Sequence, residues 1–107
     1  MKRFECMVER TDRYIIEIDE NIINEEWMKD YAKYFADFKT LEEHAENLAQ
    51  FRARFGEHDF IEGYGVVNVN GKDPRWIDKT PRDESEEAIN IKVVSEDQSC
   101  FVDVEEI

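Results

Sequence analysis

Apolar and polar residues alternate in four segments of the chain. Every second residue is apolar in RFECMVER and RYIIEID near the start, and in AINIKVV and CFVDV near the end. Because successive side chains of a strand point to opposite faces, this period of two predicts strands that each bury one face. The alternation runs unbroken across residues 11–13, so the first two segments are either a hairpin or one long bent strand. We expect the last two to pair as a hairpin across SEDQS.

The apolar residues between positions 24 and 38 recur every three or four residues, which is the period of an amphipathic helix. Asn24 is a favourable N-cap, because its side-chain oxygen can accept a bond from a free amide of the first turn. Two acids follow it, and acids are stabilising at this positive end of the helix dipole. The apolar stripe of this helix consists of Trp27, Tyr31, Phe35 and Phe38.

A second helix is predicted between residues 41 and 55. Thr40 and Glu43 have the spacing of a capping box, in which each side chain bonds to the backbone of the other residue. Gly56 can adopt the positive φ that often ends a helix. Because the second helix begins directly after the first, we expect the two to form a helix hairpin.

The segment FIEGYGVVNVNGKDPRW, residues 60–76, has the glycine content of a phosphate-binding loop. Such a loop leads from a strand directly into a helix, whose first amides receive the anion. Here strand-like residues follow the glycines, and there is no Gly-Lys-Ser/Thr sequence. We therefore predict that Gly63 and Gly65 bend a strand or let the helices approach it, and that Asn70-Gly71 forms the turn that ends it.

These elements follow the order ββααβββ and predict an α+β fold in a single domain over residues 1–107. We expect a mainly antiparallel sheet of about five strands, with the two-helix hairpin packed on one face. Pro74 and Pro81 predict a long exposed loop before the fourth strand, because proline cannot donate to a central strand. The chain is long enough for one modest hydrophobic core.

Composition predicts a folded protein of the cytoplasm. Hydrophobic residues make up 41% of the chain, which is too large a share for a disordered segment. The first residues carry charges where a secretory signal needs an apolar run, and no stretch approaches the length of a membrane span. In a reducing compartment Cys6 and Cys100 are expected to remain thiols and to serve as small buried hydrophobes.

The sequence offers few candidates for catalysis. His44 and His58 lack partners at the spacing of a metal site, so neither a metal nor another cofactor is predicted. The acids beside the second histidine, in FGEHDF, fit acid–base chemistry and equally fit a polar turn after a helix. A small hydrolase or transferase is therefore an alternative function. Its site would consist of His58, Asp59, Glu62 and Tyr64.

Net charge is the most informative property of the sequence. The formal value is −13, and residues 83–107 contribute −8 of it, because they contain nine acids and one base, Lys92. Acids on the predicted helices can interact with cations one turn away or with the helix dipole. The C-terminal acids either keep a sheet edge soluble or form a docking surface for a basic protein. The predicted partner-binding residues are Asp83, Glu84, Glu86, Glu87, Glu96, Asp97, Asp103, Glu105 and Glu106.

Carboxylates at alternate positions of a strand lie about 6.6 Å apart, which is comparable to the spacing of phosphates along a nucleic-acid strand. A row of them can therefore occupy a groove that is built to bind phosphate. In length and charge, and in no motif, the chain is similar to the small acidic inhibitors that phages and mobile elements use against restriction or CRISPR nucleases. This resemblance implies a non-enzymatic binding module that inhibits a DNA- or RNA-acting enzyme by mimicking nucleic acid.

The charge distribution and the apolar residues also bear on two other kinds of partner. Direct binding of nucleic acid is disfavoured, because the basic residues between positions 72 and 82 are few and the rest of the chain is acidic. We expect that segment to be an ordinary loop with Trp76 against the body of the protein. A homo-oligomer that uses the aromatic helices or a sheet edge is a further hypothesis.

Overall fold

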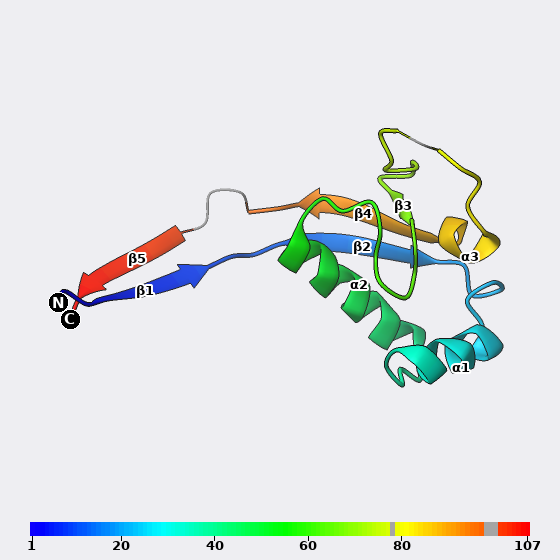
Figure 1. The fold of residues 1–107 in the computed structure, drawn as a ribbon, viewed down its shortest axis with the longest axis horizontal. Helices are drawn as coiled ribbons and strands as arrows, with labels where there is room; N and C mark the ends of the chain where they lie inside the picture. Colours follow the sequence, from blue (N-terminus) through cyan, green and yellow to red (C-terminus); the bar gives the residue numbers. More distant parts are fainter. Residues whose placement is uncertain (78, 98–100) are drawn as a thin grey trace.

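The computed structural model describes residues 1–77, 79–97 and 101–107 and has the predicted α+β architecture (Figure 1). Its strands form two small sheets, with the orders β1–β5 and β2–β4–β3. The order of the elements is the expected one, with a short additional helix before the fourth strand. The elements are β1 (Phe4–Glu9), β2 (Arg13–Ile18), α1 (Glu25–Tyr34), α2 (Leu41–Phe55), β3 (Asn68–Val69), α3 (Glu84–Glu87), β4 (Ile89–Ser95) and β5 (Phe101–Glu106).

Strands β1 and β2 continue one another in the same direction, as one long bent ribbon (Figure 1). β1 pairs antiparallel with β5, and β2 pairs antiparallel with β4. The expected hairpin of the last two strands is therefore wrong, since β4 and β5 pair with different partners. For the first two strands the bent-strand alternative is the correct one. The alternating apolar residues are at even-numbered positions in both β1 and β2, so the two strands can follow one another without a change of face.

The glycine-containing segment is mostly loop. Within it the strand β3 comprises only Asn68 and Val69, which pair parallel to β4. Gly63 and Gly65 have φ values of 89° and 84°, which bend the chain away from an extended path. Asn70 and Gly71 both have positive φ and form the predicted turn. The prediction of a strand over most of this segment is therefore wrong, whereas its end was predicted correctly.

The ends of both main helices agree with the sequence signals. The Asn24 side chain accepts a bond from the Trp27 amide at 3.0 Å, and the Thr40 hydroxyl accepts one from the Glu43 amide at 3.2 Å. Gly56 follows α2 with a φ of 71°. These bonds satisfy backbone amides that have no partner within the helix.

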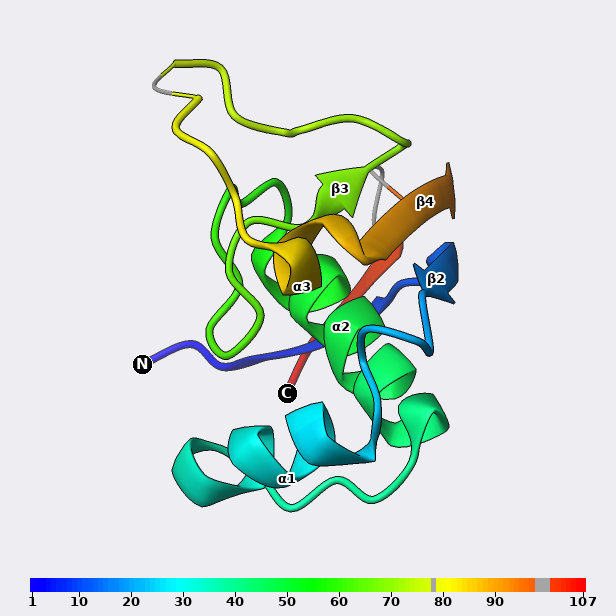
Figure 2. The ribbon, with the colours of Figure 1, turned by 90° about the vertical axis from the view of Figure 1, so that its right-hand side faces the viewer.

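The core lies where α2 packs on the inner face of β2 and β4. Figure 2 shows α2 between these strands and α1. Tyr14, Ile16 and Ile18 of β2 face the core, whereas the alternate residues of this strand are exposed. The fully or nearly buried hydrophobic residues are Ile23, Tyr31, Leu48, Ile61, Tyr64, Val67, Ile89 and Ile91.

The paired strands β1 and β5 project from this core as an arm, which we define as residues 1–10 and 101–107 (Figure 1). The arm makes the molecule elongated, with extents of 54 × 32 × 24 Å. The radius of gyration is 17.1 Å, whereas a compact chain of this length would have about 13 Å. The arm therefore lies outside the compact body.

The loop that contains the basic residues is held by an ion pair and a hydrogen bond to the backbone. Arg75 donates to Asp73 at 2.8 Å, and Arg82 donates to the Val66 carbonyl at 3.1 Å. These arginines therefore have structural roles, and their side chains are only 12% and 11% exposed. The expectation for Trp76 is wrong, because this side chain is 91% exposed.

Candidate functional site

The arm has one apolar face. Residues directly opposite one another in an antiparallel pair share a face, and Cys6 lies opposite Val104. Phe4 and Val8 lie on the same face as Cys6, because they are two residues away from it along the strand. All of β1 is exposed, with exposed fractions of 57% for Phe4 and 60% for Val8. We call the residues Phe4, Cys6, Val8 and Val104 the apolar face of the arm.

The expected burial of Cys6 is therefore wrong, since this residue is exposed. The expectation was based on alternation alone, which shows that one face of a strand is apolar but not that another element covers it. Cys100 lies outside the described residues.

The other face of the arm is acidic. Glu5 lies directly opposite Glu105, and Asp103 is two residues from Glu105 on the same face. Glu9 is on this face as well, whereas Glu106, opposite Phe4, is on the apolar side. Among the described residues, no cation lies within ion-pair distance of these arm acids. We call Glu5, Glu9, Asp103 and Glu105 the acidic face of the arm.

The acids around α3 have roles within the fold. Asp83 caps α3 by accepting a bond from the Glu86 amide at 3.1 Å, and the Glu86 side chain accepts one from the Asp83 amide in return. Glu86 also accepts a bond from the Val66 amide at 2.6 Å. Glu87 lies 3.9 Å from Arg82. Local contacts thus account for three of these four acids, and no hydrogen bond or ion pair is found for the side chain of Glu84 among the described residues.

Glu96 and Asp97 lie at the junction between the body and the arm. Glu96 accepts two bonds from the Arg52 guanidinium, at 2.9 Å and 3.2 Å, and one from the Tyr14 hydroxyl at 2.7 Å. The bonds from Arg52 hold the pKa of Glu96 below its usual value. Burial, together with the bond to Glu96, raises the pKa of Tyr14 to about 12, so its hydroxyl remains a donor. The Asp97 amide donates to Asp12 at 3.0 Å.

The nine acids predicted to bind a partner thus lie in three places. One group surrounds α3, a second joins α2 to the base of the arm, and a third lies on the arm itself. Figure 1 shows α3 and the tip of the arm at opposite ends of the molecule. The structure therefore does not bring the nine acids together on one surface. It places the third group beside Glu5 and Glu9, which are at least 92 positions earlier in the chain than the β5 residues opposite them (Glu9 to Phe101). Their separation along the chain gives no sign of this proximity.

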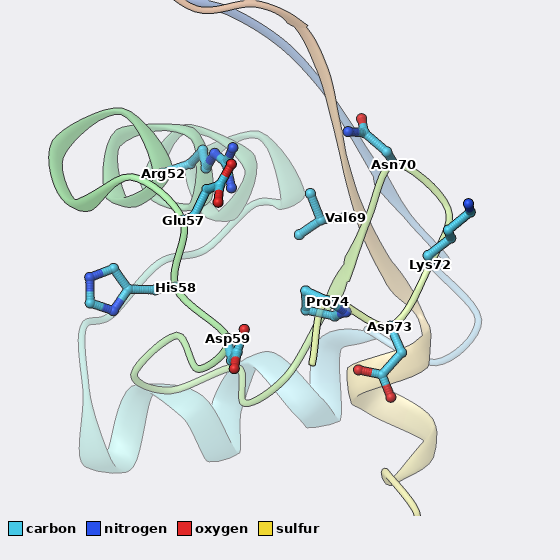
Figure 3. A pocket seen from close by; sticks show the side chains of 9 residues that line it. All are labelled: Arg52, Glu57, His58, Asp59, Val69, Asn70, Lys72, Asp73 and Pro74. Carbon is cyan, nitrogen blue, oxygen red and sulfur yellow. The ribbon is translucent and has the colours of Figure 1, made fainter. Parts of the chain in front are cut away.

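The residues proposed for an enzyme active site do not converge. His58 and Asp59 line an open cavity of about 450 Å³ between the end of α2 and the β3 turn (Figure 3). Figure 3 shows the side chains of His58 and Lys72 on opposite sides of this cavity, pointing away from one another. Glu62 lines a different cavity. Tyr64 is buried in the core, so the four residues do not form one site.

Tyr64 instead belongs to a buried polar group beneath an aromatic cluster. Its hydroxyl lies 2.8 Å from Nδ1 of His44 and accepts a bond from the side-chain amide of Asn47 at 3.2 Å. His44 is fully buried among the rings of Trp27 and Tyr31. Burial lowers the pKa of His44, which keeps this imidazole neutral. No described residue bonds to its Nε2. These two side chains therefore belong to the core, with exposed fractions of 0% for His44 and 4% for Tyr64.

Two further observations concern the described residues as a whole. No three His, Cys, Asp or Glu side chains in residues 1–77, 79–97 and 101–107 are grouped so that they could hold a metal ion. No helix in this part of the chain has both the length and the apolar character needed to cross a membrane.

Comparisons with protein-family models, curated proteins and solved structures found no match to this chain.

Proposed function

We propose that this protein is a non-enzymatic binding module that engages a basic protein partner through the acidic face of its arm. The observation that carries the proposal is the position of Glu105, which lies directly opposite Glu5 and two residues from Asp103. Like charges at such positions destabilise a sheet. A cationic partner would relieve this repulsion, whereas Glu86, Glu87 and Glu96 already bond to other residues of the body.

The chemistry of the arm favours a partner that normally binds nucleic acid. The carboxylates of Asp103 and Glu105 are separated by two residues of a strand, which is about 6.6–6.8 Å. A projecting arm can enter a groove, and its acidic face would there contact lysines and arginines that bind phosphate. The proposed outcome is inhibition of the partner, because the arm would occupy the site of its substrate.

A matched pair of variants tests this proposal. The arm variant carries Glu5→Gln, Asp103→Asn and Glu105→Gln. The control variant carries Glu20→Gln, Glu46→Gln and Glu62→Gln, which are exposed acids of the body. Each variant changes the net charge by the same amount, from −13 to −10 (−13 + 3), so they differ only in where the charge is lost.

The assay measures DNA or RNA cleavage by a panel of purified restriction endonucleases and RNA-guided nucleases in the presence of each protein. We expect the wild type and the control variant to inhibit at least one of these enzymes and the arm variant to be at least about tenfold weaker. Inhibition should fall between about 50 and 200 mM salt, because ions screen the contacts. Equal inhibition by the two variants, or none by the wild type, would show that the proposal is wrong.

A further inference from the structure

The outer edge of β1 is a row of backbone donors and acceptors without a partner among the described residues. The Ile107 amide donates to the Arg3 carbonyl at 2.9 Å, so the backbone groups of Arg3 point toward β5. Because these directions alternate along a strand, Glu5, Met7 and Glu9 also point toward β5. The backbone groups of Phe4, Cys6 and Val8 consequently point away from it. Proteins usually cover or protect such an edge.

We propose that this edge pairs with the same edge of a second copy of the chain. The two β1 strands would run antiparallel across a two-fold axis and join the two arms into one four-stranded sheet, β5–β1–β1–β5. A two-stranded ribbon is only marginally stable by itself, whereas a sheet of three or more strands with an apolar face is stable. The pairing also unites the apolar faces of the two arms into one larger apolar surface.

The charges of β1 favour its self-pairing over that of β5. β5 carries Asp103, Glu105 and Glu106 without any base, so that two β5 strands side by side would repel one another. The acidic side of β1 ends with Glu9 and is preceded by Arg3, whose carbonyl still accepts a bond from the Ile107 amide, so this side carries both signs. In an antiparallel pair these two ends meet.

The same charges select one register. The apolar faces join on one side of the sheet only when the two-fold axis passes through a residue of β1. An axis at Met7 would place Glu5 opposite Glu9 twice, and an axis at Glu5 would place this residue opposite its own copy. An axis at Phe4 would place Arg3 opposite Glu5 twice, but it pairs residues 1–7 alone and leaves Val8 and Glu9 of β1 without a partner. An axis at Cys6 places Arg3 opposite Glu9 twice, and Phe4 opposite Val8 twice. It also places Lys2 opposite Arg10, but both lie outside the strand, and Arg10 is paired with Asp12 at 2.8 Å. The axis at Cys6 is therefore the proposed register.

In this register Phe4, Cys6 and Val8 exchange backbone hydrogen bonds with Val8, Cys6 and Phe4 of the second copy. The interface is small, since each copy contributes one strand of six residues. It lies below the size of standard stable interfaces, and we therefore expect a dimer whose dissociation constant is roughly micromolar.

Charge reversal tests the register directly. Arg3→Glu places two acids opposite each other at both ends of the interface, and Glu9→Arg does the same with two bases. The double variant restores both pairs in the opposite orientation and retains the net charge of −13. Within one copy these residues are six positions apart, or about 20 Å along the strand, so their exchange creates no new pair inside the monomer. Glu20→Arg is the control, because it has the same net charge as Glu9→Arg and lies on the body.

Sedimentation equilibrium between about 1 and 100 µM measures the dissociation constant, and circular dichroism confirms that each variant is folded. We expect each arm reversal to raise the dissociation constant at least about tenfold, and we expect the double variant and the control to resemble the wild type. A wild type that remains monomeric throughout this range overturns the proposal and leaves the edge for a different protein. Failure of the double variant to restore association overturns it as well.

Crosslinking provides a second measurement. In a Cys100→Ser background Cys6 is the single thiol, and in the proposed register the two copies of Cys6 lie opposite one another with Cα atoms about 5.5 Å apart. A short bismaleimide should therefore yield a covalent dimer efficiently, and the yield should fall when Arg3→Glu is added. A yield that Arg3→Glu does not change contradicts the register. These readouts are independent of nuclease inhibition, so dimerisation and the proposed function can fail separately.

Discussion

Replacing Arg52 with methionine should strongly destabilise the protein, because Glu96 would lose both of its guanidinium bonds. The side chains of Arg52 and Glu96 are only 9% and 13% exposed, so water compensates little for the lost partner. Removing one member of a buried ion pair typically costs 3–5 kcal/mol, and we expect about 3 kcal/mol here, because Glu96 keeps the bond from Tyr14. For a domain whose total stability is about 5–15 kcal/mol, this is a large share.

The double variant isolates the interaction. Glu96→Gln should cost about 2 kcal/mol, since it removes the negative charge beside the Arg52 guanidinium and leaves one acceptor oxygen in place of two. Arg52→Met with Glu96→Gln removes both charges together and leaves a neutral acceptor for Tyr14, so its cost should be about 2–3 kcal/mol and not the sum of about 5. The difference corresponds to a coupling energy of about 2–3 kcal/mol.

Urea unfolding monitored by the fluorescence of Trp27 gives these free energies. The more exposed Trp76 is replaced with Phe in every protein, so that its signal does not interfere. If the costs of the two single variants add up to the cost of the double variant within about 0.5 kcal/mol, the coupling is refuted. It would then follow that Arg52 and Glu96 stabilise the fold independently of one another.

Acid pH provides an independent check of the same pair. Arg52 lowers the pKa of Glu96 in the folded state. The resulting stability is fully present above the unfolded pKa of about 4.5 and is lost as the pH falls through the lower folded pKa. We expect Arg52→Met to reduce this loss, measured as the change in the free energy of unfolding below pH 4.5.

Two further predictions concern the core. Because burial lowers the pKa of His44 from 6.5, its contribution to stability is complete above pH 6.5 and decreases as the pH falls below that value. His44→Leu should remove this pH dependence of the free energy of unfolding, measured by urea titrations between about pH 7 and 5.5. An unchanged dependence would contradict the assignment to His44. Gly63→Ala should cost about 2 kcal/mol, since its φ is positive and its Cβ would lie 2.5 Å from Cε2 of Tyr31. Gly71→Ala has a similar φ with no atom within 4 Å, so a smaller cost is expected, and equal melting-temperature shifts would show that the Tyr31 contact is unimportant.

Local signals in the sequence were sufficient for the two main helices, most strands and the turn at Asn70-Gly71, but not for the short helix α3. Each of these depends on groups a few residues apart, such as Asn24 and the Trp27 amide. A side-chain cap or a positive φ acts within one turn of the chain, so its effect can be predicted without knowing the rest of the fold. The α+β class and the order of the elements follow from the same local periodicities.

Strand pairing and the placement of charges were decided only by the tertiary structure. Alternation shows that β1, β2, β4 and β5 each have an apolar face, but any of them could satisfy this requirement with several partners. Because β1 pairs with β5 and projects from the body, Cys6 is exposed. The same pairing places Glu5 opposite Glu105, which is 100 positions (105 − 5) later in the chain. Likewise Glu96 and Glu105 are both acids near the end of the sequence, but Glu96 is bonded to a buried arginine and Glu105 is not. An acid's role depends on the cations near it in space, and the sequence alone does not specify those distances.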